Sequence, residues 1–232
     1  MSTKLLSINS DHKTIKGVKF GFLTGILYLA PSNESGVINT CPNASKGCRV
    51  ACLYTAGRGV MSPVKAARVK KTIMFAKERE KFMKLLIDDI AHGIRKAKRQ
   101  SLEFVVRLNG TSDIAWEKLL CDGKNNIMEL FPSVQFYDYT KSPSRILKYL
   151  AGGMPSNYHL TFSRSESNAL MAKNLFEDGA NVAIVYVDLP KHEKVIDGDI
   201  SDLRFLDPVN SIIALKAKGK AKKDTSGFVV HT

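Results

Sequence analysis

The sequence lacks any long run of apolar residues. Its longest apolar stretch, residues 22–30, is interrupted by Thr24 and Gly25, and it is far shorter than the roughly 20 residues needed to cross a bilayer. The first ten residues also lack the apolar core of a secretory signal. We therefore expect no membrane-spanning helix, no membrane partner and a cytoplasmic location.

Acidic residues are the minority among the charged residues. The chain has 22 Asp and Glu against 35 Lys and Arg, which gives a formal net charge of +13 at pH 7. This excess favours anionic partners such as nucleic acid, nucleotides or phosphate-rich surfaces, without choosing among them. Hydrophobic residues make up 44% of the 232 residues. That proportion supports a sizeable core and argues against a disordered or fibrous protein.

Cysteine is also scarce, with four residues in the whole chain. Disulfides are not expected in a reducing cytoplasm. Three of the four, Cys41, Cys48 and Cys52, are spaced C-x6-C-x3-C in one loop that also contains Pro, Asn and Gly. Three thiolates brought together suit a soft metal or an iron–sulfur cluster, because bound metal offsets the cost of deprotonating them.

Two alternatives remain open for these cysteines. A structural zinc site would need a fourth ligand, from Cys121 or from a histidine far along the chain. The three could also be unliganded thiols. Cys121 itself lies in an amphipathic segment beside Leu119 and Leu120 and is expected to be a half-buried thiol.

Strand and helix patterns alternate along the chain, as in successive β-α units. The predicted strands span residues 22–29, 103–108, 134–139, 158–162, 182–187 and 211–215, the predicted helices span 62–99, 143–150 and 166–178, and an amphipathic stretch spans 114–131. About six strands, several of them roughly 20 to 30 residues apart, indicate a parallel sheet. We therefore predict an α/β fold, a partial (β/α)6-type barrel, in preference to an open doubly wound sheet.

No second domain boundary is visible. A short basic N-terminal arm, residues 1–20, precedes a single barrel-like domain over residues 21–228. This domain includes the cysteine loop, residues 40–59, and ends in a basic C-terminal segment, residues 216–232. Residues 189–208 carry many charges and little hydrophobic periodicity, so they are predicted to form a long loop or small insertion on the ligand-binding face.

Polar side chains follow several predicted strands. Ligands of parallel α/β proteins bind beyond the carboxyl ends of the strands, so these side chains are candidates for binding a cofactor or substrate. They are Asn109, Ser112, Asp113, Thr140, Lys141, Ser163 and Arg164.

Several of these side chains also have a structural interpretation. Ser112 or Asp113 would serve as a helix N-cap, and Arg164 would pair with Glu166 on the surface. Lys141 is equally ambiguous. His159, in a predicted strand, is more typical of a hydrogen-bonded core group than of a ligand.

The C-terminal segment is the most basic part of the chain. Its lysines are spaced among Gly and Ala and would follow a phosphate backbone, while the alternative is a solvated tail. They are Lys216, Lys218, Lys220, Lys222 and Lys223. Arg68 belongs to further basic residues on the early helices. Acidic residues including Asp199 and Asp202 lie in the preceding loop, where they would either bind a divalent ion in a nuclease or pair with the nearby lysines.

The order of these features resembles a known family. A strand, a three-cysteine loop with Tyr54 just after its last cysteine, a helix and five further strands resemble the radical S-adenosylmethionine enzymes. The motifs around Cys41 to Tyr54, Val106–Asp113 and Val134–Ser142 are more closely similar to phage-encoded, radical-SAM-like proteins of unassigned function, over residues 21–228. The C-x6-C-x3-C spacing is wider than the C-x3-C-x2-C of most radical-SAM enzymes.

The resemblance implies a [4Fe–4S] cluster on Cys41, Cys48 and Cys52, with the polar strand ends contacting S-adenosylmethionine or substrate. An electron delivered through the cluster would cleave the carbon–sulfur bond of S-adenosylmethionine and give a 5′-deoxyadenosyl radical. We therefore expect an iron–sulfur protein that acts on nucleic acid or a nucleotide in the host cell cytoplasm. The alternatives are a basic nucleic-acid-binding protein with zinc or no metal, and a metal-dependent nuclease.

Overall fold

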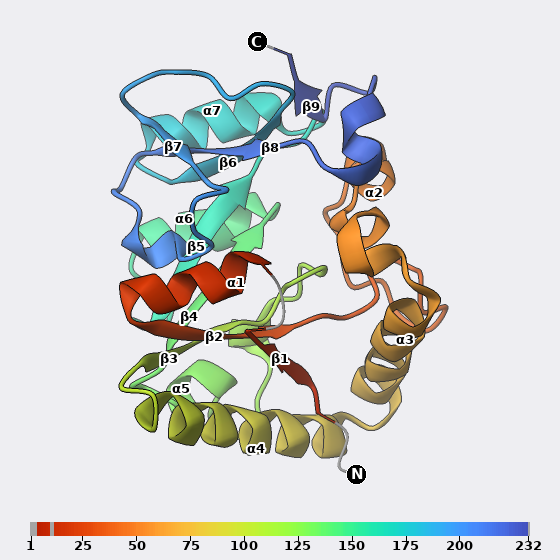
Figure 1. The fold of residues 1–232 in the computed structure, drawn as a ribbon, viewed down its shortest axis with the longest axis vertical. Coiled ribbons are helices and arrows are strands. Elements are labelled where there is room, and N and C mark those ends of the chain that lie inside the picture. Colours follow the sequence, from red (N-terminus) through yellow and green to blue (C-terminus); the bar gives the residue numbers. More distant parts are fainter. Residues whose placement is uncertain (1–3, 10–11, 232) are drawn as a thin grey trace.

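A nine-stranded, mostly parallel sheet runs through the molecule (Figure 1). The computed structural model describes residues 4–9 and 12–231. The strands lie in the order β1-β2-β3-β4-β5-β6-β8-β7, and β9 pairs with β6. They are β1 Leu6–Ile8, β2 Phe22–Leu27, β3 Glu103–Arg107, β4 Gln135–Thr140, β5 Tyr158–Ser163, β6 Val182–Tyr186, β7 Val195–Asp197, β8 Ile212–Lys216 and β9 Val229–Val230.

The prediction of a single α/β domain with a mostly parallel sheet is confirmed. β1 runs antiparallel to β2, and every other pairing between these strands is parallel. The predicted barrel is not confirmed, because the described sheet has two separate edges at β1 and β7. β1 takes the free edge of β2 and β7 takes that of β8, so neither edge is left to close a barrel.

Helices cover the two faces of the sheet unequally. They are α1 His12–Gly17, α2 Lys46–Val50, α3 Ser62–Lys77, α4 Arg79–Lys98, α5 Ile127–Leu130, α6 Pro143–Leu150 and α7 Ala169–Glu177. Because successive strand residues point to opposite faces, Phe136 joins the main core under α4 to α7, whereas Tyr137 packs on the other face with Leu203. α1 lies over this second face (Figure 1).

Helix boundaries depart from the sequence pattern in three places. The stretch 62–99 forms two helices, separated at Glu78, whose φ of −129° and ψ of 52° are not helical. α7 begins at Ala169 rather than Glu166, because Asn168 Oδ1 accepts the Ser165 N–H and closes a turn. The amphipathic stretch 114–131 is interrupted by a turn at Gly123, where φ is +82°, and only its end forms α5.

The predicted arm and insertion both add to the sheet. Within residues 1–20, β1 and α1 pack on the domain rather than extending from it, while residues 1–3, 10 and 11 lie outside the described part of the chain. Within 189–208, β7 adds a strand beside β8, and the short 3-10 helix η5 (Arg204–Leu206) packs on β4 and β5. Among the described residues, no helix has the length and apolar character needed to span a membrane.

Candidate functional site

The first cysteine lies between two strand ends. The Thr40 hydroxyl donates to the Ala30 carbonyl at 2.7 Å, and the Thr40 carbonyl accepts the Asp113 N–H at 2.8 Å. Cys41 follows directly, and its thiol donates to the Thr111 carbonyl, with a sulfur–oxygen distance of 3.6 Å. The loop after β2 is thus tied to the loop after β3, and Cys41 lies at their junction.

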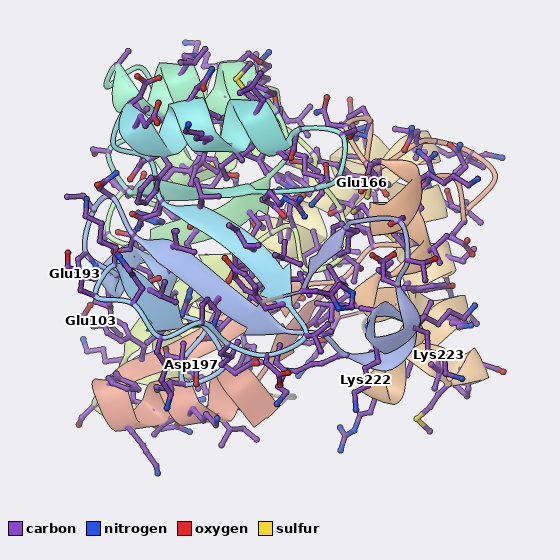
Figure 2. All side chains as sticks on the ribbon, turned by 90° about the horizontal axis from the view of Figure 1, so that it is seen from above. Glu103, Glu166, Glu193, Asp197, Lys222 and Lys223 are labelled. Carbon is purple, nitrogen blue, oxygen red and sulfur yellow. The ribbon has the colours of Figure 1, made fainter. Side chains whose placement is uncertain are left out.

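The second and third cysteines are held by a short helix and its anchor. Cys48 lies in α2, where its N–H donates to Ser45 Oγ at 3.1 Å, and Cys52 follows the helix. Glu166, in the loop after β5, accepts the Ser45 hydroxyl at 2.7 Å and the Gly47 N–H at 2.8 Å. Figure 2 shows Glu166 directed toward this helix. The cysteine loop is therefore fixed to the carboxyl end of β5.

All three thiols are half-buried and form no disulfide. Backbone N–H groups point at two of the sulfurs, that of Ser32 at Cys41 (3.3 Å) and that of Tyr54 at Cys52 (3.5 Å). Burial raises the pKa of Cys41 and raises that of Cys52 to about 11, and the charge of Cys48 adds to both shifts. The thiols therefore interact with one another, and their joint deprotonation requires added positive charge.

Three thiols can bind a single metal ion or an iron–sulfur cluster, and the two differ in the distance between the sulfurs. Among the described residues, no three His, Cys, Asp or Glu side chains are arranged to hold one metal ion. Zinc–sulfur bonds of about 2.3 Å would require thiolates only about 3.8 Å apart. In an iron–sulfur cluster each cysteine binds a different iron, so the sulfurs lie further apart. The N–H groups at the sulfurs of Cys41 and Cys52 would stabilise thiolate charge in either kind of site.

Arg68, from α3, lies next to this loop and is not on the exposed basic face where the sequence suggested it. Its side chain is buried, and its guanidinium carbon lies 4.7 Å from the centre of the Tyr28 ring and 5.6 Å from that of Tyr54. Burial lowers the pKa of Arg68, and the negative charge of Cys52 opposes this shift. Nothing in the spacing of the lysines and arginines of α3 distinguishes this residue, so the sequence analysis missed its position.

Asn109 and Ser112 hold the loop after β3 together. The Asn109 side-chain oxygen accepts the Ser112 hydroxyl at 2.8 Å and the Trp116 indole N–H at 3.2 Å. Its amide nitrogen donates to Asp138 Oδ2 at 3.1 Å. The polar atoms of Asn109 are therefore engaged within the loop and with β4.

Asp113 and Lys141 connect neighbouring strand ends. Asp113 accepts the backbone N–H of Lys141 and the Arg145 guanidinium, each at 2.9 Å, and is not a helix N-cap. The Lys141 ammonium donates to Ser163 Oγ at 2.6 Å. Thr140 accepts the Ser142 N–H at 3.1 Å and is buried. Asp113, Lys141 and Ser163 are thus linked to one another at the carboxyl ends of the strands, where the cysteines also lie.

Arg164 binds the end of the chain instead of Glu166. Its guanidinium donates to the carbonyls of Gly227 and Phe228 at 2.6 and 3.1 Å. The Lys141 ammonium lies 5.6 Å from the centre of the Phe228 ring. Residues 224–230 therefore lie over the strand ends, where β9 extends the sheet beside β6.

The basic C-terminal segment packs against the cysteine loop and is not a solvated tail. Ala217, Ala221 and Val229 form a small core with Ala51, and Cys48 packs against it. The short 3-10 helix η6 (Gly219–Lys223) lies beside α2, and Lys222 and Lys223 project from it (Figures 1 and 2). Within the described chain Lys216 pairs with Asp188 and Lys218 with Asp199, whereas no ion pair is formed by the other lysines, Lys220, Lys222 and Lys223.

The acidic residues of the preceding loop are engaged by cations. Asp202 accepts the Arg107 guanidinium at 3.0 Å, and Asp199 accepts the Lys218 ammonium at 2.7 Å. Tyr137 also donates to Asp202, at 3.3 Å. This supports the salt-bridge interpretation of these carboxylates over a divalent-ion site.

Two buried charged residues behind the strand ends escaped the sequence analysis. Burial raises the pKa of Asp138 to about 7, although the hydrogen bond from the Asn109 N–H opposes this shift. Arg145 donates to Asp113, to Glu117 and to the Tyr158 hydroxyl. Asp138 interrupts the aromatic strand 135–140, and a charged residue in so apolar a strand was the available signal.

Comparison with known proteins places the whole domain in one family. No curated protein and no solved structure matches the chain. The family model described as gene product 88 matches residues 3–232, which includes the cysteine loop, every strand and the C-terminal segment. The chain therefore belongs to the gene product 88 family of phage proteins.

Proposed function

We propose that this protein is a radical-SAM-like iron–sulfur protein that acts on nucleic acid or a nucleotide. The observation that supports this proposal is the meeting of three thiols with the polar ends of β3, β4 and β5. In parallel α/β proteins, ligands bind beyond the carboxyl ends of the strands. The cluster would be held by Cys41, Cys48 and Cys52.

The chain's own residues have separable roles in this proposal. The N–H groups of Ser32 and Tyr54 stabilise negative charge on the sulfurs of Cys41 and Cys52. Lys141 is half-buried and cationic, so it would bind the carboxylate of S-adenosylmethionine or a substrate phosphate. When bound, the cluster supplies one electron, taken from an external reductant, for cleavage of the carbon–sulfur bond of S-adenosylmethionine.

Cleavage of S-adenosylmethionine tests the proposal. The anaerobically reconstituted protein is reduced with dithionite, and 5′-deoxyadenosine and methionine are measured by chromatography. Wild type and Cys121→Ser should form both products, because Cys121 packs against the main core away from the loop. Cys48→Ser should form neither. Absence of cleavage by cluster-loaded wild type, or equal cleavage by Cys48→Ser, would contradict the proposal.

A second candidate is a nucleic-acid-binding protein whose cysteines hold zinc or no metal. It is favoured by the exposed lysines of η6, which face solvent beside the cysteine loop. Cationic side chains on one short element suit a phosphate backbone. This candidate differs from the first in needing no iron.

A further inference from the structure

Arg68 carries a buried positive charge without a protein counter-ion. It is 9% exposed, and its Nε and Nη1 have no hydrogen-bond partner in the described part of the chain. Within the same part no carboxylate forms an ion pair with it. Because an unpaired buried charge is costly, a cation in this position indicates an anion that is absent from the protein's own side chains.

The surroundings of Arg68 hold its guanidinium plane without satisfying its charge. Tyr28 follows β2 and Tyr54 follows Cys52, and both rings lie within cation–π distance of the guanidinium. Tyr54 also donates its backbone N–H to Cys52 Sγ at 3.5 Å. One residue therefore contacts both the buried cation and the last cysteine, and places them side by side.

The described part of the cysteine loop lacks a hydrogen-bonding cation, whereas Arg68 lacks an anion. Its three sulfurs become anionic when they bind metal, and no described Lys or Arg side chain donates a hydrogen bond to them. A [4Fe–4S] core with three thiolates carries net negative charge, which increases on reduction. The unpaired cation and the prospective anion lie next to each other, in a site shielded from water on the Arg68 side.

We propose that Arg68 is the counter-charge of the iron–sulfur cluster, lying beside Cys52 and stabilising the reduced, more negative state. This rests on the proposed function, because it requires the cluster. A positive charge near a buried cluster favours the added electron. Arg68 is thus a positioning and tuning residue for the cluster and not one of its ligands.

The midpoint potential of the reconstituted full-length protein tests this proposal. Arg68→Met and Arg68→Gln remove the charge, and both should shift the midpoint to a more negative potential than wild type. Arg68→Lys keeps the charge without the planar group that stacks on tyrosine, so its midpoint should lie nearer to wild type. Lys70→Met removes an exposed charge from the same helix and should leave the midpoint unchanged.

The outcomes separate this proposal from the function on which it rests. Wild type that takes up no iron would contradict the proposed function itself. Wild type that carries a cluster, with neutral Arg68 variants at the same midpoint, would overturn the role of Arg68 alone. A Lys variant shifted as far as the neutral variants would also overturn it, because charge would then not be the cause. The two neutral variants differ in polarity, so the test stands if one fails to fold.

Discussion

Arg145 links three groups behind the strand ends. Its guanidinium contacts Asp113, Glu117 and the Tyr158 hydroxyl, and its side chain is 5% exposed. Asp113 in turn accepts the N–H of Lys141. Arg145, a buried residue outside the cysteine loop, therefore sets the position of residues at the carboxyl ends of the strands.

Replacing Arg145 tests this support. Arg145→Met leaves two buried carboxylates without a counter-charge, so the free energy of unfolding should fall by about 3–5 kcal/mol. Urea unfolding followed by circular dichroism measures it. Lys148→Met, on the exposed face of the same helix, should change the free energy by no more than about 0.5 kcal/mol. Equal effects of the two substitutions would show that the ion pairs are not structural.

His159 is a half-buried residue of β5, and it makes stability depend on pH. Burial and the charge of Arg204 lower its pKa from 6.5 to about 4, and its Nδ1 lies 3.0 Å from the Tyr149 hydroxyl. Between these pH values the unfolded chain binds a proton that the folded chain refuses, so stability falls as pH falls. The contribution lost from pH 7 to pH 4 is about 3 kcal/mol.

The substitution His159→Phe removes that contribution. Urea unfolding at several pH values from 7 to 4 should show a smaller loss of stability on acidification than in wild type. His192→Phe, at an exposed histidine, should retain the wild-type dependence. A His159→Phe profile parallel to that of wild type would mean that folding does not lower the pKa of His159.

At the scale of elements, the end of the chain and the loop after β5 hold the cysteine loop in place. β9 pairs with β6, η6 contacts the 3-10 turn Leu53–Thr55 that follows α2, and Glu166 anchors the first turn of α2. Hydrogen bonds from Ser45 and Gly47 outweigh burial and lower the pKa of Glu166. The carboxylate is therefore ionised at neutral pH and bonds strongly to its donors.

Loss of the Glu166 anchor should expose Cys48. Glu166→Ala removes two hydrogen bonds to a charged group, each contributing about 1.5 kcal/mol or more, so local opening of α2 should be on the order of a hundredfold more frequent. Alkylation of the metal-free, reduced protein by iodoacetamide, followed by mass spectrometry, measures the rate at each cysteine. Cys121 serves as the internal reference, and Glu177→Ala on α7 is the control. Unchanged alkylation of Cys48 would contradict the anchor.

The sequence predicted the regular elements well, because their signals are local. Alternating β-strand patterns and the proline at the start of α6 place β4, β5, β6 and α6 within one or two residues. The attachment of the C-terminal segment could not be predicted, because it depends on small residues, Ala217 and Ala221, packing against Ala51. Contacts of alanines over such sequence separations leave no periodic pattern.

The same limit applies to the candidate site. The three cysteines and Lys141 were identified from residue type and position after a strand. The hydrogen bond of Asn109 to Asp138, the contact of Arg68 with Tyr28 and the anchor at Glu166 each join residues from different parts of the chain. Such pairs are set by tertiary packing, which a single sequence does not encode in any local spacing.

At the scale of the whole molecule, only part of the net charge of +13 can attract an anionic ligand at the surface. Arg68, Arg107 and Arg145 are buried or nearly so, and Lys216 and Lys218 are paired with aspartates. The exposed, unpaired lysines of η6 lie beside the cysteine loop, near the carboxyl ends of the strands. A polyanion bound to these lysines would therefore lie next to the cysteine loop.

Salt dependence of nucleic-acid binding tests this surface. Changing Lys220, Lys222 and Lys223 to Ala should weaken binding of a single-stranded oligonucleotide and reduce the slope of log K against log salt by about 2, at roughly 0.7 per lost phosphate contact. Fluorescence anisotropy over a range of KCl concentrations measures it. The control removes the same charge from the end of α4, by changing Arg95, Lys98 and Arg99 to Ala. Equal losses in both triple variants would indicate unspecific attraction.

Metal content shows most directly whether three cysteines of this domain hold an iron–sulfur cluster. Protein reconstituted anaerobically is analysed for iron, sulfide and zinc per chain, in wild type, Cys48→Ser and Cys121→Ser. We expect about four iron and four sulfide in wild type and Cys121→Ser, with loss of both in Cys48→Ser. Zinc alone, no metal, or equal iron in all three proteins would contradict it.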